Sequence, residues 1–166
     1  HIDVLCGHYH NVVHWNQQAV QAVLKYYTRE RAYNLYTGYR QHNYHFVVYG
    51  ALFLGQFAPA IEALKGLQET TPEKMLRIES PPMADYFESF MALEPHILVR
   101  FGKWDEAINL PLPQDPDLYR TLTASVHYAR TVAHAALGNV TAAEAEEALF
   151  LAAKARVPDT RLMHNN

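Results

Sequence analysis

Histidine is the residue type in this sequence with the clearest chemical potential. The chain has ten histidines in 166 residues, and His42 and His45 lie three positions apart. In a helix this spacing places both imidazoles on one face. Imidazole is the commonest protein ligand for zinc and other first-row metals. The pair therefore predicts two neighbouring donors, which need a third ligand from elsewhere to form a metal site.

Other catalytic signatures are absent from the sequence. It contains no glycine-rich phosphate loop and no HExxH, CxxC or GxSxG pattern. The single cysteine, Cys6, directly precedes a glycine, and we expect it to be a small buried hydrophobic residue rather than a nucleophile. It cannot form an internal disulfide, which is typical of a reducing intracellular compartment such as the cytoplasm. The motifs thus favour a non-catalytic protein.

Composition indicates a folded domain with a substantial core. Apolar residues make up 49% of the chain and charged residues 19%, which excludes intrinsic disorder. The net charge is −3 and the basic residues are scattered singly, so we expect no nucleic-acid partner. The longest apolar run, residues 46–54, is too short to span a membrane. The acidic run at residues 144–147 is typical of a solvated helix face.

A short motif recurs four times along the chain. It consists of an apolar residue, a glycine, any residue and then an aromatic or aliphatic one, and a small or β-branched residue follows five positions after the glycine. Glycine ends a helix readily because it adopts a left-handed conformation at little cost. A small residue in the following helix allows two helices to approach closely. The glycines are Gly7, Gly55, Gly102 and Gly138, and the small residues are Val12, Ala60, Ala107 and Ala143.

The copy at residues 101–108, Phe-Gly-Lys-Trp-Asp-Glu-Ala-Ile, resembles the turn and second-helix start of a tetratricopeptide repeat. The resemblance implies an all-α chain of stacked antiparallel hairpins, an α-solenoid of about four repeats forming one domain over residues 1–166. The glycine spacings exceed the usual 34 residues. The proline-rich segment 110–117 is expected to shorten the second helix of the third repeat. Because the chain starts at His1 without a methionine, we expect a central fragment of a longer protein of this kind.

Helical periodicity accompanies the motif through most of the chain. Proline-containing segments at residues 70–72, 80–82 and 110–117 predict loops. The expected helices cover residues 12–27, 45–57, 60–68, 84–101, 122–138 and 142–155.

The resemblance also implies which side chains line a concave groove. In such repeats the first helix faces the groove, at positions about thirteen, ten, six and two residues before the turn glycine. These positions hold His42, His45, Tyr49 and Phe53 in the second repeat, Ser89, Ala92, His96 and Arg100 in the third, Ser125, Tyr128, Val132 and Ala136 in the fourth, and His1 and Leu5 in the first.

Two functions remain open from the sequence. In the first, the groove binds a protein or peptide partner, or further repeats of the same chain, through Tyr49, Phe53, Arg100 and Tyr128 together with the histidines. Arg100 is suited to a carboxylate because a guanidinium offers paired donors. In the second, His42 and His45 hold a divalent transition metal (Zn, Fe or Cu) with His96 or His1, as a metal-binding protein or metalloenzyme.

Overall fold

The computed structural model describes residues 1–30 and 35–161 of the chain. All regular elements among these residues are helices, and no strand occurs among them, which confirms the all-α prediction. The chain divides into two compact units, His1–Pro72 and Glu73–Asn166. That the chain forms one domain of about four repeats stays a prediction. No helix in the described ranges is both long and apolar enough to cross a membrane.

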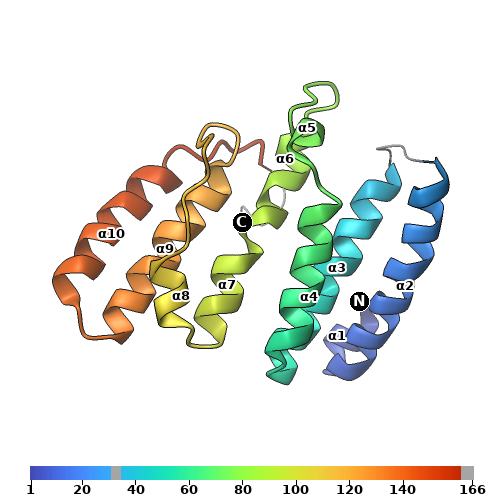
Figure 1. The fold of residues 1–166 in the computed structure, drawn as a ribbon, viewed down its shortest axis with the longest axis horizontal. Helices are drawn as coiled ribbons and strands as arrows, with labels where there is room; N and C mark the ends of the chain where they lie inside the picture. Colours follow the sequence, from blue (N-terminus) through green and yellow to red (C-terminus); the bar gives the residue numbers. More distant parts are fainter. Residues whose placement is uncertain (31–34, 162–166) are drawn as a thin grey trace. The chain divides into compact units, whose positions relative to one another are not determined.

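The first unit consists of helices α1 (Ile2–Leu5), α2 (Tyr9–Glu30), α3 (Leu35–Leu54) and α4 (Phe57–Glu69). Helix α3 packs against α2 on one side and against α4 on the other (Figure 1). Their shared interior is aliphatic, as the apolar periodicity predicts. It is formed by Val12, Val13 and Val20 of α2, Val47, Val48 and Ala51 of α3, and Ala60, Ala63, Leu64 and Leu67 of α4.

Two glycines inside helices allow these three helices to approach one another closely. A Cβ atom added at Gly50 would lie 2.9 Å from Val13 Cγ2, so α2 and α3 could not pack as closely with a larger residue there. At Gly66 of α4 the added Cβ would lie 2.6 Å from the ring of Tyr44. The Tyr44 ring of α3 therefore fills the space that a side chain at Gly66 would need.

The second unit is built around α9 (Arg120–Ala136), which packs against α10 (Val140–Lys154), α8 (Trp104–Ile108), α7 (Leu93–Arg100) and a 3-10 helix, η1 (Glu88–Ala92). Two short helices, α5 (Glu73–Leu76) and α6 (Met83–Phe87), complete it. The buried carboxylate of Glu88 accepts hydrogen bonds from the backbone N–H groups of Thr121 and Leu122 at 3.2 and 2.9 Å. These are unsatisfied donors of the first turn of α9, so Glu88 caps that helix from a distant segment.

The helix predicted over residues 84–101 is wrong as a single element. It is divided into α6, the 3-10 helix η1 and α7. The cause is Pro95, because a proline ring clashes with the carbonyl four residues earlier and removes a hydrogen-bond donor. Pro95 is the third residue of α7, where a backbone N–H has no partner within the helix, so its absence is tolerated. A longer α-helix that included Met91 would bring the Met91 carbonyl against the proline ring. Helix α8 spans only five residues, which confirms the shortening expected from the proline-rich segment.

The four motif glycines occupy four turns of the same geometry. Gly7, Gly55, Gly102 and Gly138 have φ angles of 74°, 68°, 64° and 76°. At each turn the glycine N–H donates to the carbonyl three residues earlier, and the next N–H donates to the carbonyl five residues earlier at 2.8–2.9 Å. This is the Schellman arrangement that ends a helix with a left-handed residue. The prediction that these glycines end helices is confirmed.

The residues five positions after these glycines are all buried. Val12, Ala60, Ala107 and Ala143 are 3%, 0%, 0% and 8% exposed. Each lies in the first turns of the helix that follows its glycine, where a larger residue would hold two helices apart. The prediction of a small residue at a close approach is thus confirmed in all four copies.

Cys6 is exposed, and the expectation that it is buried is wrong. It follows the last residue of α1, a helix of four residues with none buried. The corresponding residue of the fourth turn, Leu137, is also 54% exposed. The position before a turn glycine lies where the chain leaves the helix, so an apolar residue there is not necessarily covered.

Candidate functional site

A row of rings runs along one face of α3. His42, Phe46, Tyr49 and Phe53 follow one another at intervals of four, three and four residues. At about 100° per residue these four side chains project within roughly 60° of each other. His45 lies at the edge of the same face, and it is joined by the rings of Tyr9 from α2 and of His1, the residue before α1. We call these seven residues the aromatic strip.

Ring contacts connect the strip from end to end. The ring centroids of His42 and Phe46 are 4.3 Å apart, those of Phe46 and Tyr49 are 6.4 Å apart and those of Tyr49 and Phe53 are 4.8 Å apart. Tyr9 stacks on Phe53 at 4.5 Å. Tilted and stacked rings at these distances stabilise one another beyond the area that they bury. The strip is therefore a preformed surface.

The strip remains accessible to solvent. Phe53 is 52% exposed, and Phe46, Tyr49, His42 and His45 are half-buried. Single exposed apolar residues are ordinary, whereas a contiguous row of partly exposed rings is a candidate interaction surface. The predicted groove residues Tyr49 and Phe53 both belong to it.

His1 and His42 form a direct pair. Their Nε2 atoms are 3.1 Å apart and their ring planes differ by 12°. A hydrogen bond between two imidazole nitrogens requires one protonated and one unprotonated nitrogen, so at least one ring is neutral. Burial lowers the pKa of His42 below its ordinary value, which favours the neutral form.

The sequence-predicted residues of the second unit form a smaller group. The ring of His96 on α7 is 5.7 Å from that of Tyr128 on α9, and Tyr128 is 6.3 Å from Phe150 on α10. Desolvation lowers the pKa of His96, although the residue itself is exposed. Arg100, the last residue of α7, is exposed as well.

Two predicted groove positions are wrong. Ser89 and Ala92 are 5% and 4% exposed and lie in η1, among the buried residues of the second unit. The prediction extended the register of α7 back through Pro95 as if the helix were continuous. Because a 3-10 helix has about three residues per turn, each position before the proline is rotated relative to that register.

The metal hypothesis stays a prediction. In the part of the chain that the structure describes, no group of three or more His, Cys, Asp or Glu side chains could hold a metal ion. The structure pairs His1 with His42, His45 borders Phe46 at 5.9 Å, and His96 belongs to the second unit. The donor set His1, His42, His45 and His96 therefore has to be tested with metal in solution.

Two residues of the strip were missed by the sequence reasoning. Phe46 lies four positions after His42, so its spacing alone could have assigned it to the same face. Tyr9 is the aromatic residue of the first copy of the turn motif, and nothing local indicates that its ring reaches Phe53 of another helix.

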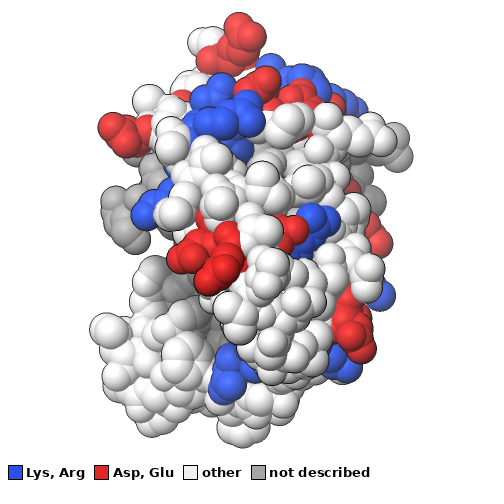
Figure 2. All heavy atoms as spheres, turned by 90° about the vertical axis from the view of Figure 1, so that its left-hand side faces the viewer, with Lys and Arg blue, Asp and Glu red and all other residues white. Residues whose placement is uncertain are grey.

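Acidic and basic side chains lie next to one another on the face that carries α10. Figure 2 shows basic and acidic side chains interspersed there, without a continuous basic stripe on this face. Within the second unit, basic residues are paired with acidic ones, for example Arg77 with Asp115 and Arg156 with Asp117, at 2.7 and 2.6 Å. That the chain has no nucleic-acid partner stays a prediction.

Comparison with known proteins adds no assignment, since no family model, no curated protein and no solved structure matches the chain.

Proposed function

We propose that this chain is a tetratricopeptide-repeat-like helical scaffold that binds a protein segment along the aromatic strip of α3. Support for the repeat comes from the four turns, which share one backbone geometry, one hydrogen-bond pattern and a buried small residue five positions later. Stacked hairpins of this kind use extended surfaces for binding proteins.

The observation that carries the proposal is the continuity of the strip. From His42 to Phe53 it extends over eleven residues of helix, or about 16 Å. That length matches roughly five residues of an extended chain. Aromatic surfaces supply large contact areas at little cost in side-chain entropy, and for this reason they dominate interfaces.

A metal-binding function remains the second candidate because of one contact. The Nε2 atoms of His1 and His42 are 3.1 Å apart, and both could become metal donors if the proton between them were displaced. Such a site would require further ligands, with His45 as the candidate from the same unit, whereas His96 belongs to the other unit.

Selection from a displayed random-peptide library on the immobilised protein tests the proposal. Peptides that bind the wild type should lose at least about tenfold in affinity for a Tyr49→Ala/Phe53→Ala variant, because buried aromatic anchors contribute most of such binding energy. Trp15→Ala is the matched control, since Trp15 is an exposed aromatic residue of α2, 61% exposed, outside the strip.

Peptides that bind the double variant as tightly as the wild type would contradict the strip as the binding surface. Equal loss with Trp15→Ala would also contradict it, because the effect would then not be specific to α3. Circular dichroism of each variant checks that the helices are intact.

A further inference from the structure

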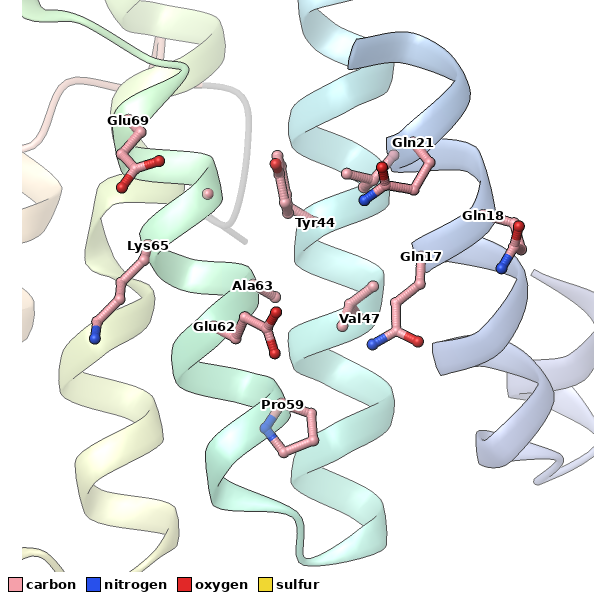
Figure 3. Close-up of a pocket in the computed structure, with 12 residues that line it drawn as sticks. Gln17, Gln18, Gln21, Tyr44, Val47, Pro59, Glu62, Ala63, Lys65 and Glu69 are labelled. Atoms are coloured by element: carbon pink, nitrogen blue, oxygen red, sulfur yellow. The ribbon is translucent and has the colours of Figure 1, made fainter. Parts of the chain in front are cut away.

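A groove of ≈ 600 Å³ lies between α2 and α4 in the first unit (Figure 3). Tyr44 and Val47 of α3 form its floor, and Ala63 and Pro59 of α4 extend it. Tyr44 and Val47 project from α3 about half a turn away from Tyr49 of the aromatic strip. The groove and the strip are therefore on opposite faces of α3, and an inference about one does not depend on the other.

The rim of the groove is polar. Gln17 and Gln21 of α2 and Glu62 of α4 line it, and Figure 3 shows the side chains of Gln17 and Glu62 pointing toward each other across the gap. All three side chains are exposed. Two amides and a carboxylate thus offer donors and acceptors to a ligand in the same space.

The charge along α4 favours a cation. Glu62 and Glu69 both line the groove, and Lys65 is the one basic residue among its lining side chains. Seven residues separate the two carboxylates, so they lie on one side of the helix about 10 Å apart along its axis. In an extended peptide, two residues three positions apart are also about 10 Å apart, so one such peptide could reach both carboxylates.

The apolar floor selects the kind of cation. A small inorganic ion would gain nothing from Pro59, which is half-buried, whereas the methylene stem of a long basic side chain would cover it. A guanidinium offers five donors in a plane, which suits a carboxylate on one side and an amide oxygen on the other. Glu62 and Gln17 present those two acceptors from opposite walls.

We propose that this groove binds an extended, arginine-bearing segment of a partner protein. One arginine stem lies against Pro59, its guanidinium contacts the Glu62 carboxylate and the Gln17 amide oxygen, and a second basic residue three positions away lies near Glu69. The chain would then hold partners on two faces of α3, an aromatic-binding segment on the strip and a basic segment in the groove.

Fluorescence anisotropy with the labelled peptide Ala-Arg-Ala-Ala-Arg-Ala tests the proposal, and the same peptide with citrulline in place of both arginines is the neutral comparison. We expect the arginine peptide to bind the wild type about fivefold or more tightly than the citrulline peptide, and to weaken as salt is raised. Equal binding of the two peptides would overturn the proposal.

Two exposed positions give variants that leave the core untouched. Glu62→Gln should weaken the arginine peptide about fivefold and leave the citrulline peptide unchanged, and Gln17→Glu should strengthen it by a similar factor. Glu144→Gln on α10 is the matched control, since it removes an exposed carboxylate from the other unit. If Glu62→Gln and Gln17→Glu bind the arginine peptide as the wild type does, the groove is not its site.

A last variant separates the two proposed surfaces. Phe53→Ala should leave binding of the arginine peptide unchanged, because Phe53 lies on the strip. Loss of binding with Phe53→Ala and not with Glu62→Gln would place the peptide on the strip and overturn the groove proposal alone.

Discussion

The Nδ1 atom of His127 lies 2.7 Å from Oε2 of Glu146, and this contact joins α9 to α10. Both side chains are largely buried, with 9% and 17% of their surface exposed. Arg130 approaches the other Glu146 oxygen at 3.5 Å and donates to the carbonyl of Leu110 at 2.6 Å. The sequence predicted that residues 144–147 form a solvated acidic face, and for Glu146 this prediction is wrong. Glu144 and Glu147 beside it are exposed.

Removing this carboxylate should destabilise the second unit. Glu146→Ala leaves the His127 ring and the Arg130 guanidinium without their shared partner, and we expect a loss of about 1.5–3 kcal/mol in the free energy of unfolding. Glu147→Ala, one residue further on, should change it by less than about 0.5 kcal/mol. Urea denaturation of both variants measures the difference, and equal effects would contradict a structural role for the contact.

The turn glycines predict a second stability effect. At Gly138 an added Cβ would meet no atom within 4 Å, so only the positive φ angle opposes a side chain. Gly138→Ala should therefore cost about 1–2 kcal/mol through backbone strain. Gly138→Asn should cost less, since asparagine enters the left-handed region more readily. Thermal unfolding compares the two variants, and an asparagine variant as unstable as the alanine variant would contradict the strain argument.

The helices and their turns could be predicted from the sequence because their causes are local. Apolar residues recur with the helical period, and a glycine in a left-handed conformation leaves a recognisable motif. The proline-rich segment similarly predicted the short α8. The position of Phe53 on an accessible face of α3 followed from counting back from Gly55.

Contacts between helices could not be predicted in this way. Nothing near Glu88 indicates that its carboxylate caps α9, and nothing near His1 indicates a partner at His42, because both pairs depend on how distant segments pack. The groove position predicted at Ser89 was wrong for a related reason. A single proline six residues later changed the local helix type and rotated the preceding side chains toward the core.

The paired histidines lead to a prediction about metal. Within the described chain no third ligand joins His1 and His42, so we expect no stoichiometric metal in the purified protein after mild chelation. Elemental analysis of the wild type and of a His42→Ala/His45→Ala variant measures this. His10→Ala/His14→Ala, which removes an exposed pair from α2, controls for adventitious binding. One metal per chain that is lost only in the first variant would establish the metal-binding alternative.

The buried cap of α9 predicts how stability depends on pH. Desolvation is the largest influence on Glu88 and raises its pKa above the ordinary value of 4.5, although the two N–H donors of α9 act in the opposite direction. As pH rises from about 4.5, the unfolded chain loses this proton first, while the folded chain still holds it. Between these two pKa values the folded state therefore binds more protons than the unfolded state. The contribution of Glu88 to the free energy of unfolding then falls as pH rises.

Glu88→Gln isolates this effect because a glutamine does not titrate. The amide can accept only one of the two backbone hydrogen bonds, which lowers stability by an amount that does not vary with pH. The difference in unfolding free energy, wild type minus Glu88→Gln, should therefore decline as pH is raised from 4.5 toward neutrality. Urea titrations at several pH values measure that slope. A rising difference would mean that the hydrogen bonds from Thr121 and Leu122 outweigh the desolvation of the carboxylate.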